Sequence, residues 1–430
     1  MEAYAKRSNE ELKALQEELR QKYEQIKAEG MKLDMSRGKP SKAQLDLSDG
    51  MLNSLKDNRD CIDENGLDCR NYGEMEGTPE ARRLMGDMMG VPADNVIVLG
   101  NASLTIMFDN VARAFTHGIC GNAPWDFNSK VRFLCPVPGY DRHFSITEYF
   151  GVEMINIPML PTGPDMDMVE YYVNNDTTVK GMWCVPKYSN PQGITYSRET
   201  VDRFARLKPA ASDFRIFWDN AYVIHSLYEP DERDYLPEIF TECAKYGNED
   251  MVYEFCSTSK VSYAGAGISA IAASKRNLED IKGHMKYQTI SHDKINQLRH
   301  VKFFGNFDGM LEHMKKHAEL LRPKFKLVDD VLTRELGGTG TGSWINPRGG
   351  YFVSFEANEG CAKEIVQMAK EAGLILTPAG SAFPYHVDPL DTNIRIAPSL
   401  PEIEDLEKAL NVFTTCVKLV SIGKILSERE

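Results

Sequence analysis

Residues 251–260 of the chain are MVYEFCSTSK, an apolar run that ends in a small polar turn and a lysine. The run at 251–256 predicts a buried strand. Further runs predict strands of the same kind at residues 96–99, 131–135, 182–185, 215–218 and 268–273. Most of these runs are continuous rather than alternating, as in a parallel sheet that helices cover on both faces. Because helical stretches separate them, the sequence predicts a doubly wound, mostly parallel α/β domain.

The pattern changes after about residue 300. A helical segment at 310–336 leads to a strand at 350–355, a helix at 362–372 and a closing helix from Glu402, which predicts a smaller α+β domain. At the other end, Ser8 and Glu11 have capping-box spacing, so a helix should begin there and end near Gly30. We therefore predict three parts. They are an N-terminal helix and arm at 1–50 that packs with the small domain, a large domain at 51–305 and the small domain at 306–430.

The composition narrows the functional classes. The formal net charge of −13 argues against a nucleic-acid partner, because phosphates favour a basic surface. The nine cysteines are odd in number and show no Cys-x-x-Cys pair or zinc-finger spacing, so reduced, buried thiols and no metal site are expected. The amino terminus is polar, and no apolar run approaches the length of a membrane span. These features predict a cytoplasmic enzyme without membrane contact.

Polar residues follow three predicted strands at the edge where a doubly wound sheet binds its ligands. Asn190 follows the run at 182–185, Asp219 the run at 215–218 and Lys260 the run at 251–256. Taken singly, such an aspartate is more often a helix cap, and such a lysine is more often a solvated surface charge. The small residues at 100–103 precede an amphipathic helix, whose free N–H groups suit a phosphate. Together these features predict a ligand site at this edge of the sheet.

Four motifs, taken together and in this order, resemble a known family: Asn190-Pro191-x-Gly193, Asp219-x-Ala221-Tyr222, Ser257-x-Ser259-Lys260 and Asn393-x-Arg395. They resemble the class I/II aminotransferases, which are fold type I enzymes that use pyridoxal 5′-phosphate (PLP). The likeness is greatest to a bacterial subgroup of aspartate aminotransferases. It covers nearly the whole chain, from the segment at 36–40 to Arg395. The resemblance implies a homodimer with active sites at the interface between subunits and between the two domains.

The resemblance also implies a role for each matching residue. Lys260 forms the Schiff base with PLP, and Asp219 pairs with the pyridine nitrogen. Arg395 binds the substrate α-carboxylate bidentately, beside the backbone N–H of Gly38. The other implied contacts are Asn190 and Tyr222 to the phenolic oxygen, Asn190 also to the substrate, Tyr140 stacked on the ring, Asn101, Ala102, Ser103 and Ser257 at the phosphate, and Tyr72 at the phosphate of the partner subunit.

The implied chemistry explains why these residue types are needed. PLP accepts the electron pair left when the substrate Cα proton departs, and a carboxylate beside the pyridine nitrogen keeps that nitrogen protonated. Lys260 can move the proton if its surroundings lower its pKa from the ordinary ~10.4. One position departs from the family, because the arginine expected eight residues after the lysine is Ile268 here. The phosphate should then depend on amides, hydroxyls and Tyr72, with Lys187 as a further candidate.

These observations predict transamination between an L-amino acid and a 2-oxo acid, with L-aspartate and 2-oxoglutarate as the expected pair. Alternatives on the same fold are an alanine or aromatic aminotransferase and a PLP-dependent β-lyase. A PLP-binding transcription regulator is a non-enzyme alternative, which the acidic charge and the short segment before the large domain disfavour. An aspartate preference needs a second cation for the side-chain carboxylate, because an unpaired carboxylate in a closed site is costly. The candidates for this cation are Arg37, Lys39, Lys286 and Arg348.

Overall fold

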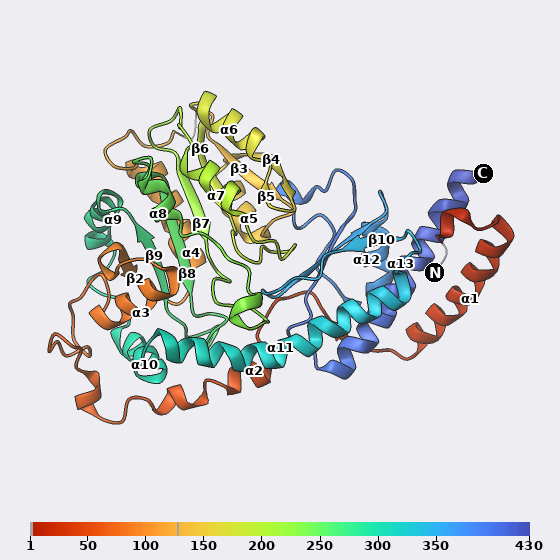
Figure 1. Cartoon of the computed structure of the whole chain (residues 1–430), viewed down its shortest axis with the longest axis horizontal. Coiled ribbons are helices and arrows are strands. Elements are labelled where there is room, and N and C mark those ends of the chain that lie inside the picture. The colour runs from red at the N-terminus through yellow and green to blue at the C-terminus, as the bar shows by residue number, and fades with distance from the viewer. Residues whose placement is uncertain (1–2, 127–128) are drawn as a thin grey trace.

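The computed structural model describes residues 3–126 and 129–430, and its largest layer is a twisted sheet (Figure 1). Within the described residues the sheet has eight strands in the order β2-β9-β8-β7-β6-β3-β4-β5. Strands β3, β4, β6, β7 and β8 pair in parallel, whereas β9 runs antiparallel to β8 and β2, and β5 antiparallel to β4. The bounds are β2 Val96–Val98, β3 Arg132–Val137, β4 Glu153–Leu160, β5 Gly163–Pro164, β6 Val179–Cys184, β7 Arg215–Asp219, β8 Val252–Ser257 and β9 Ser269–Ala273. The predicted, mostly parallel sheet is confirmed, and β4 and β5 are strands that the sequence analysis missed.

Helices cover both faces of this sheet. Consecutive residues of a strand point to opposite faces, so Phe217 packs with α4, α5 and α9 while its neighbour Ile216 packs with α6, α7 and α8. In the same way, Trp183 packs in the core with Phe217, whereas its neighbour Met182 packs in the core with Ile216. The bounds are α4 Ser103–His117, α5 Asp141–Tyr149, α6 Met166–Asn175, α7 Arg198–Ala205, α8 Ile239–Ala244 and α9 Lys275–Gln288. Two apolar cores explain why the strand sequences are continuous, and they confirm the doubly wound fold.

A second, smaller sheet lies at the other end of the molecule (Figure 1). It has the order β10-β11-β13 and is antiparallel, and a separate pair joins β1 to β12 in parallel. The bounds are β1 Leu33–Asp34, β10 Gly342–Trp344, β11 Val353–Ala357, β12 Leu374–Ile375, β13 Asn393–Ile396, α11 Phe307–Leu336, α12 Ala362–Glu371 and α13 Ile403–Arg429. The remaining helices are α2 Lys42–Asp46, α3 Pro79–Met89 and α10 Lys294–Phe304.

The N-terminal helix α1 (Asn9–Ala28) packs beside α12 and α13, far from the large sheet (Figure 1). The predicted capping box is present, because Ser8 accepts from the Glu11 amide and the Glu11 side chain accepts from the Ser8 amide. Tyr23 donates to the carbonyl of Met368 on α12 at 3.0 Å. These contacts join the two ends of the chain, while the predicted domain limits at residues 50 and 305 stay a prediction.

The closing helix α13 differs from what the sequence predicted about membrane spans. By length and composition it is apolar enough to cross a membrane, with a mean hydropathy of 1.5 over its most apolar window. However, 72% of that window is buried inside the protein. Its apolar side chains, including Phe413 and Val417, pack in one core with α1, α11 and α12. The apolar sequence of α13 is therefore accounted for by burial in this core.

Candidate active site

A cavity of about 1010 Å³ lies over the carboxyl ends of β6, β7 and β8, beside the amino termini of α4 and α5 and against the small sheet. This is the edge at which doubly wound sheets bind ligands. Most residues that the sequence singled out meet here. The predicted residues that line the cavity are Gly38, Ala102, Ser103, Tyr140, Asn190, Asp219, Tyr222, Ser257, Lys260 and Arg395.

Asp219 ends strand β7 at the floor of the cavity and is 3% exposed. Its Oδ2 lies 3.0 Å from Nε2 of His143, and its Oδ1 is buried without a hydrogen-bond partner in the described chain. The His143 ring is itself stacked on Trp183, with ring centroids 4.6 Å apart. Asp219 is thus fixed through one oxygen and keeps the other as a free acceptor. The sequence analysis missed His143, although it lies one helical turn after Tyr140.

Lys260 follows strand β8, and its Nζ lies 4.8 Å from the centroid of the Tyr222 ring. Burial lowers the pKa of Lys260, and the nearby Asp219 carboxylate opposes this shift. Burial also raises the pKa of Tyr222 well above its usual range, so its hydroxyl keeps its proton. The lysine is therefore easier to deprotonate than a surface lysine, as a proton-transferring amine requires.

The amino terminus of α4 and the turn before Lys260 form the polar end of the cavity. The helix starts after Ala102, with no side chain of the described residues capping its first amides. Ser257 and Ser259 lie side by side, with their hydroxyls 3.1 Å apart, and Ser259 donates to the carbonyl of Asn101 at 3.2 Å. Free amides and hydroxyls at a helix start are the donors that suit a phosphate. Of these residues, Ser259 was not among the predicted contacts, and Asn101 lies next to the cavity without lining it.

Residue 268, where the family has an arginine, holds no cation in the structure either. Ile268 is buried in the apolar core beneath the large sheet, so no cation occupies this position. Lys187, the other candidate, does not line the cavity, and its Nζ donates to the carbonyl of Val223 at 3.0 Å. Burial lowers the pKa of Lys187 to about 8. Lys187 is therefore outside the cavity lining, and its contact with the phosphate stays a prediction.

Arg395 enters the cavity from strand β13 of the small sheet, with a side chain that is 10% exposed. Its Nη1 donates to Asp141 Oδ1 at 3.2 Å and to Asn190 Oδ1 at 3.3 Å, and its Nη2 donates to Thr377 Oγ1 at 3.1 Å. The guanidinium also lies over the Phe352 ring, 4.8 Å from the centroid. The sequence predicted Arg395 and Asn190 at this site, but gave no signal for the other three residues.

The cavity mouth carries three further cations, Arg37, Arg142 and Lys370. None of them makes an ion pair within the described residues, although the chain as a whole is acidic. Arg37 was predicted as a candidate for the side-chain carboxylate. The other candidates do not line the cavity, namely Lys39, Lys286 and Arg348.

Tyr72 does not line the cavity of its own chain. It is 72% exposed. Its expected contact with a partner subunit therefore stays a prediction. No group of three or more His, Cys, Asp or Glu residues in the described chain could hold a metal ion.

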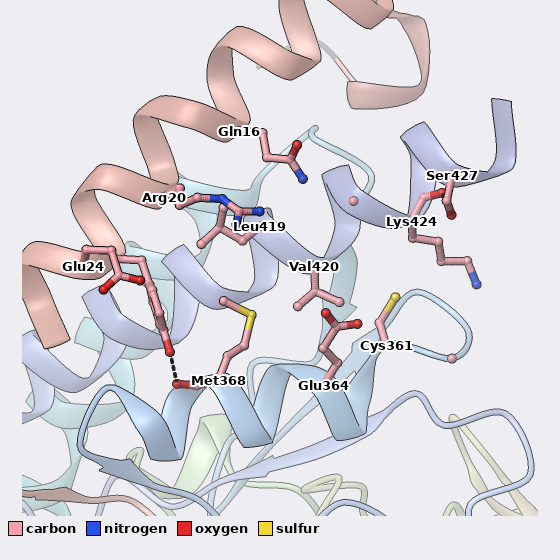
Figure 2. Close-up of a pocket in the computed structure, with 13 residues that line it drawn as sticks. Gln16, Arg20, Glu24, Cys361, Glu364, Met368, Leu419, Val420, Lys424 and Ser427 are labelled. Carbon is pink, nitrogen blue, oxygen red and sulfur yellow. Dashed lines mark hydrogen bonds between the residues drawn. The ribbon is translucent and has the colours of Figure 1, made fainter. Parts of the chain in front are cut away.

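A second cavity, of about 650 Å³, lies between α1, α12 and α13 (Figure 2). Arg20 and Glu24 reach it from α1, Glu364 from α12 and Lys424 from α13. Tyr23 is buried at its floor, with its hydroxyl already donating to the Met368 carbonyl. The charged side chains are largely exposed and of both signs. Its carboxylates are exposed, unlike the buried Asp219 over the large sheet.

Comparison with known proteins agrees with this geometry. The family model described as Aspartate amino-transferase matches residues 7–429. An aspartate aminotransferase of Corynebacterium glutamicum is 43% identical over 411 residues, which is 94% of this chain and 93% of that protein. A protein of Mycolicibacterium smegmatis, named only as an aminotransferase, is 45% identical over 417 residues, 96% of this chain and 97% of that protein. The crystal structure of an aspartate transaminase from Corynebacterium glutamicum superposes with a TM-score of 0.95 at 41% identity, covering 98% of this chain and 99% of that one.

Proposed function

The chain belongs to the aspartate aminotransferase family and is an aminotransferase, and we propose that it transfers the amino group of L-aspartate to 2-oxoglutarate. The observation that carries the proposal is the meeting of Lys260, Asp219 and Arg395 in one cavity. An amine, a buried carboxylate and a carboxylate-binding guanidinium are what amino-group transfer from an amino acid requires.

The family implies PLP as the cofactor, and the residues in the cavity fit it. The buried Asp219 Oδ1 lacks a partner in the described chain, as expected of an acceptor that is completed by a protonated ring nitrogen. The first amides of α4 supply donors for a phosphate, and the hydroxyls of Ser257 and Ser259, which donate to Ser259 and to the Asn101 carbonyl, would turn to donate to it. Lys260 would hold PLP covalently, and Tyr222 and Asn190 would donate to its phenolic oxygen.

Lys260, Asp219 and Arg395 would each have a separate role in the reaction. When bound, PLP accepts the electron pair that remains when the substrate Cα loses its proton. Nζ of Lys260 would take that proton, because burial favours the neutral amine. Asp219, held by His143, would place its carboxylate next to the ring nitrogen. Arg395 would orient the substrate through its α-carboxylate.

The preference for a dicarboxylic substrate rests on the cavity mouth. Arg37, Arg142 and Lys370 surround it and make no ion pair within the described chain. Unpaired cations around a cavity raise the local concentration of anions, and one of them can pair with a second carboxylate. Aspartate and 2-oxoglutarate each carry two carboxylates, whereas alanine carries one. This is the support for aspartate over alanine or phenylalanine.

A homodimer is part of the proposal. Tyr72 is highly exposed and lies outside the cavity of its own subunit. The family likeness implies that this tyrosine reaches the phosphate of the partner subunit. Such a contact would compensate for the missing cation at Ile268.

The direct test incubates the purified, PLP-loaded protein with a panel of L-amino acids, with and without 2-oxoglutarate, and measures glutamate, 2-oxo acids and ammonia. We expect glutamate to form fastest from aspartate, and only when the acceptor is present. Ammonia release without an acceptor would identify a β-lyase instead. Equal rates with alanine or phenylalanine would contradict the aspartate preference but not the aminotransferase activity.

A further inference from the structure

Asp141 forms an ion pair with Arg395, the arginine that is proposed to bind the substrate α-carboxylate. Asp141 is the first residue of α5, immediately after Tyr140, and its side chain is 26% exposed. Its Oδ1 lies 3.2 Å from Nη1 of Arg395, and both residues line the cavity. The described residues provide Arg395 with no other carboxylate partner within ion-pair distance.

The donors of Arg395 can be counted. A guanidinium has five N–H groups, two on each Nη and one on Nε. Asp141 and Asn190 take the two on Nη1, and Thr377 takes one on Nη2. Nε is buried without a partner in the described chain. A carboxylate that binds both Nη atoms end-on must therefore displace Asp141 or Asn190 from Nη1, and of these two Asp141 carries the same charge as the ligand.

Burial explains why a carboxylate is placed there at all. Arg395 is 90% withdrawn from solvent, and a buried guanidinium without a counter-charge is costly. Asp141 can leave at lower cost, because its side chain is partly exposed and the amino terminus of α5 favours its negative charge. The pair thus combines a fixed cation with an anion that can turn toward water.

We propose that Asp141 is a substitute for the substrate α-carboxylate, pairing with Arg395 when no substrate is bound and competing with the substrate for it. This rests on the proposed role of Arg395 in the aminotransferase site. A ligand binds only if its carboxylate outcompetes Asp141, so this residue weakens the binding of every carboxylate. A ligand with a second carboxylate can also pair with the cations at the cavity mouth, and this added interaction helps it to displace Asp141 from Arg395.

The test measures the binding of two probes to the PLP-loaded enzyme by calorimetry. Propanoate has one carboxylate and succinate has two, and neither has an amino group that could react. In Asp141→Asn we expect both probes to bind about threefold to tenfold more tightly than to the unaltered protein. Glu148→Gln is the matched control, because it removes one negative charge from the same helix without a contact to Arg395. It should change either affinity by less than about twofold.

Equal or weaker binding of both probes in Asp141→Asn, relative to Glu148→Gln, would overturn the proposal. It would mean that Asp141 positions Arg395 instead of competing for it. Asp141→Ser is measured in parallel, so that the outcome does not depend on the stability of one variant. The succinate-to-propanoate ratio of the unaltered protein tests the dicarboxylate preference separately. A ratio near one would contradict that preference and leave the comparison of variants valid.

Discussion

The cavity over the large sheet and the cavity between α1, α12 and α13 differ in what happens to their charged groups. In the first, Asp219 and Arg395 are buried, and each keeps a polar atom without a partner in the described chain. In the second (Figure 2), Arg20, Glu24 and Glu364 are exposed to solvent. Burying an ion without full pairing costs several kcal/mol, so it persists where function requires it.

The burial and pairing of the charged groups in the lining, more than the cavity volume, identify a reaction site. Both cavities are large enough for a small molecule, at about 1010 and 650 Å³. Of the two, only the first contains both a lysine of lowered pKa, Lys260, and a buried carboxylate, Asp219. Variants that change the same type of residue in both cavities therefore test whether only the first cavity is a reaction site.

The largest effect is expected for lysine. Lys260→Ala should abolish steady turnover and the covalent attachment of PLP, because no other described lysine lines that cavity except Lys370 at its mouth. Lys424→Ala is the control in the second cavity and should leave both intact. Turnover and borohydride trapping of the cofactor measure the two effects. A trapped link that persists in Lys260→Ala would contradict the assignment.

The next effect concerns the acidic residues. Asp219→Ala should fold and should lose at least about 100-fold in kcat, because the charge beside the ring nitrogen is removed. Glu364→Ala, in the second cavity, should keep kcat within about twofold, as surface changes usually do. Steady-state kinetics at full PLP occupancy compare them. Turnover of Asp219→Ala close to that of the unaltered protein would exclude the proposed role.

A smaller effect is expected at the cavity mouth. At least one of Arg37→Gln, Arg142→Gln and Lys370→Gln should lower the aspartate-to-alanine ratio of kcat/KM about tenfold, or about 1.4 kcal/mol. The lost interaction is that with the side-chain carboxylate of aspartate. Arg20→Gln removes an arginine from the second cavity and should leave the ratio unchanged. If the ratio stays constant in all three variants, the aspartate preference must be abandoned.

The smallest effect is expected for Tyr72→Phe, which removes one hydroxyl. If Tyr72 reaches the phosphate in a partner subunit, PLP affinity should fall about threefold to tenfold, because one hydrogen bond typically contributes about 0.5–1.5 kcal/mol. Tyr149→Phe is a matched control, since Tyr149 is similarly exposed at 75% against 72%. Equilibrium PLP binding and sedimentation measure affinity and assembly. A monomeric protein with an unchanged affinity would refute the shared site.

Much of the site could be predicted because its residues lie at fixed positions after the strands. Asn190, Asp219 and Lys260 follow β6, β7 and β8, and the carboxyl ends of neighbouring parallel strands must meet. Ser259 lies within one of the motifs and could have been found by its spacing. His143 and Asp141 could not, because their contacts join α5 to β7 and β13, across 76 and 254 residues of sequence.

The fold was less predictable where strands are partly exposed. β4 mixes buried, half-buried and exposed residues and contains a proline, so it lacks the continuous apolar run that marks the central strands. The reversed direction of β9 also left no local signal, because β9 is as fully buried as the parallel strands β7 and β8. Strand direction depends on how the chain returns to the sheet, which short-range patterns do not record.

The alternation of strands and helices, the motifs at the strand ends and hence the family of the chain could be predicted from the sequence alone. These depend on local spacing and on which residues avoid water. Contacts between distant segments became visible only in the folded structure. Asp141 pairs with Arg395, and His143 holds Asp219. The cations at the cavity mouth are Arg37, Arg142 and Lys370. Such contacts arise when elements distant in sequence pack together, and their energies depend on the burial that packing creates.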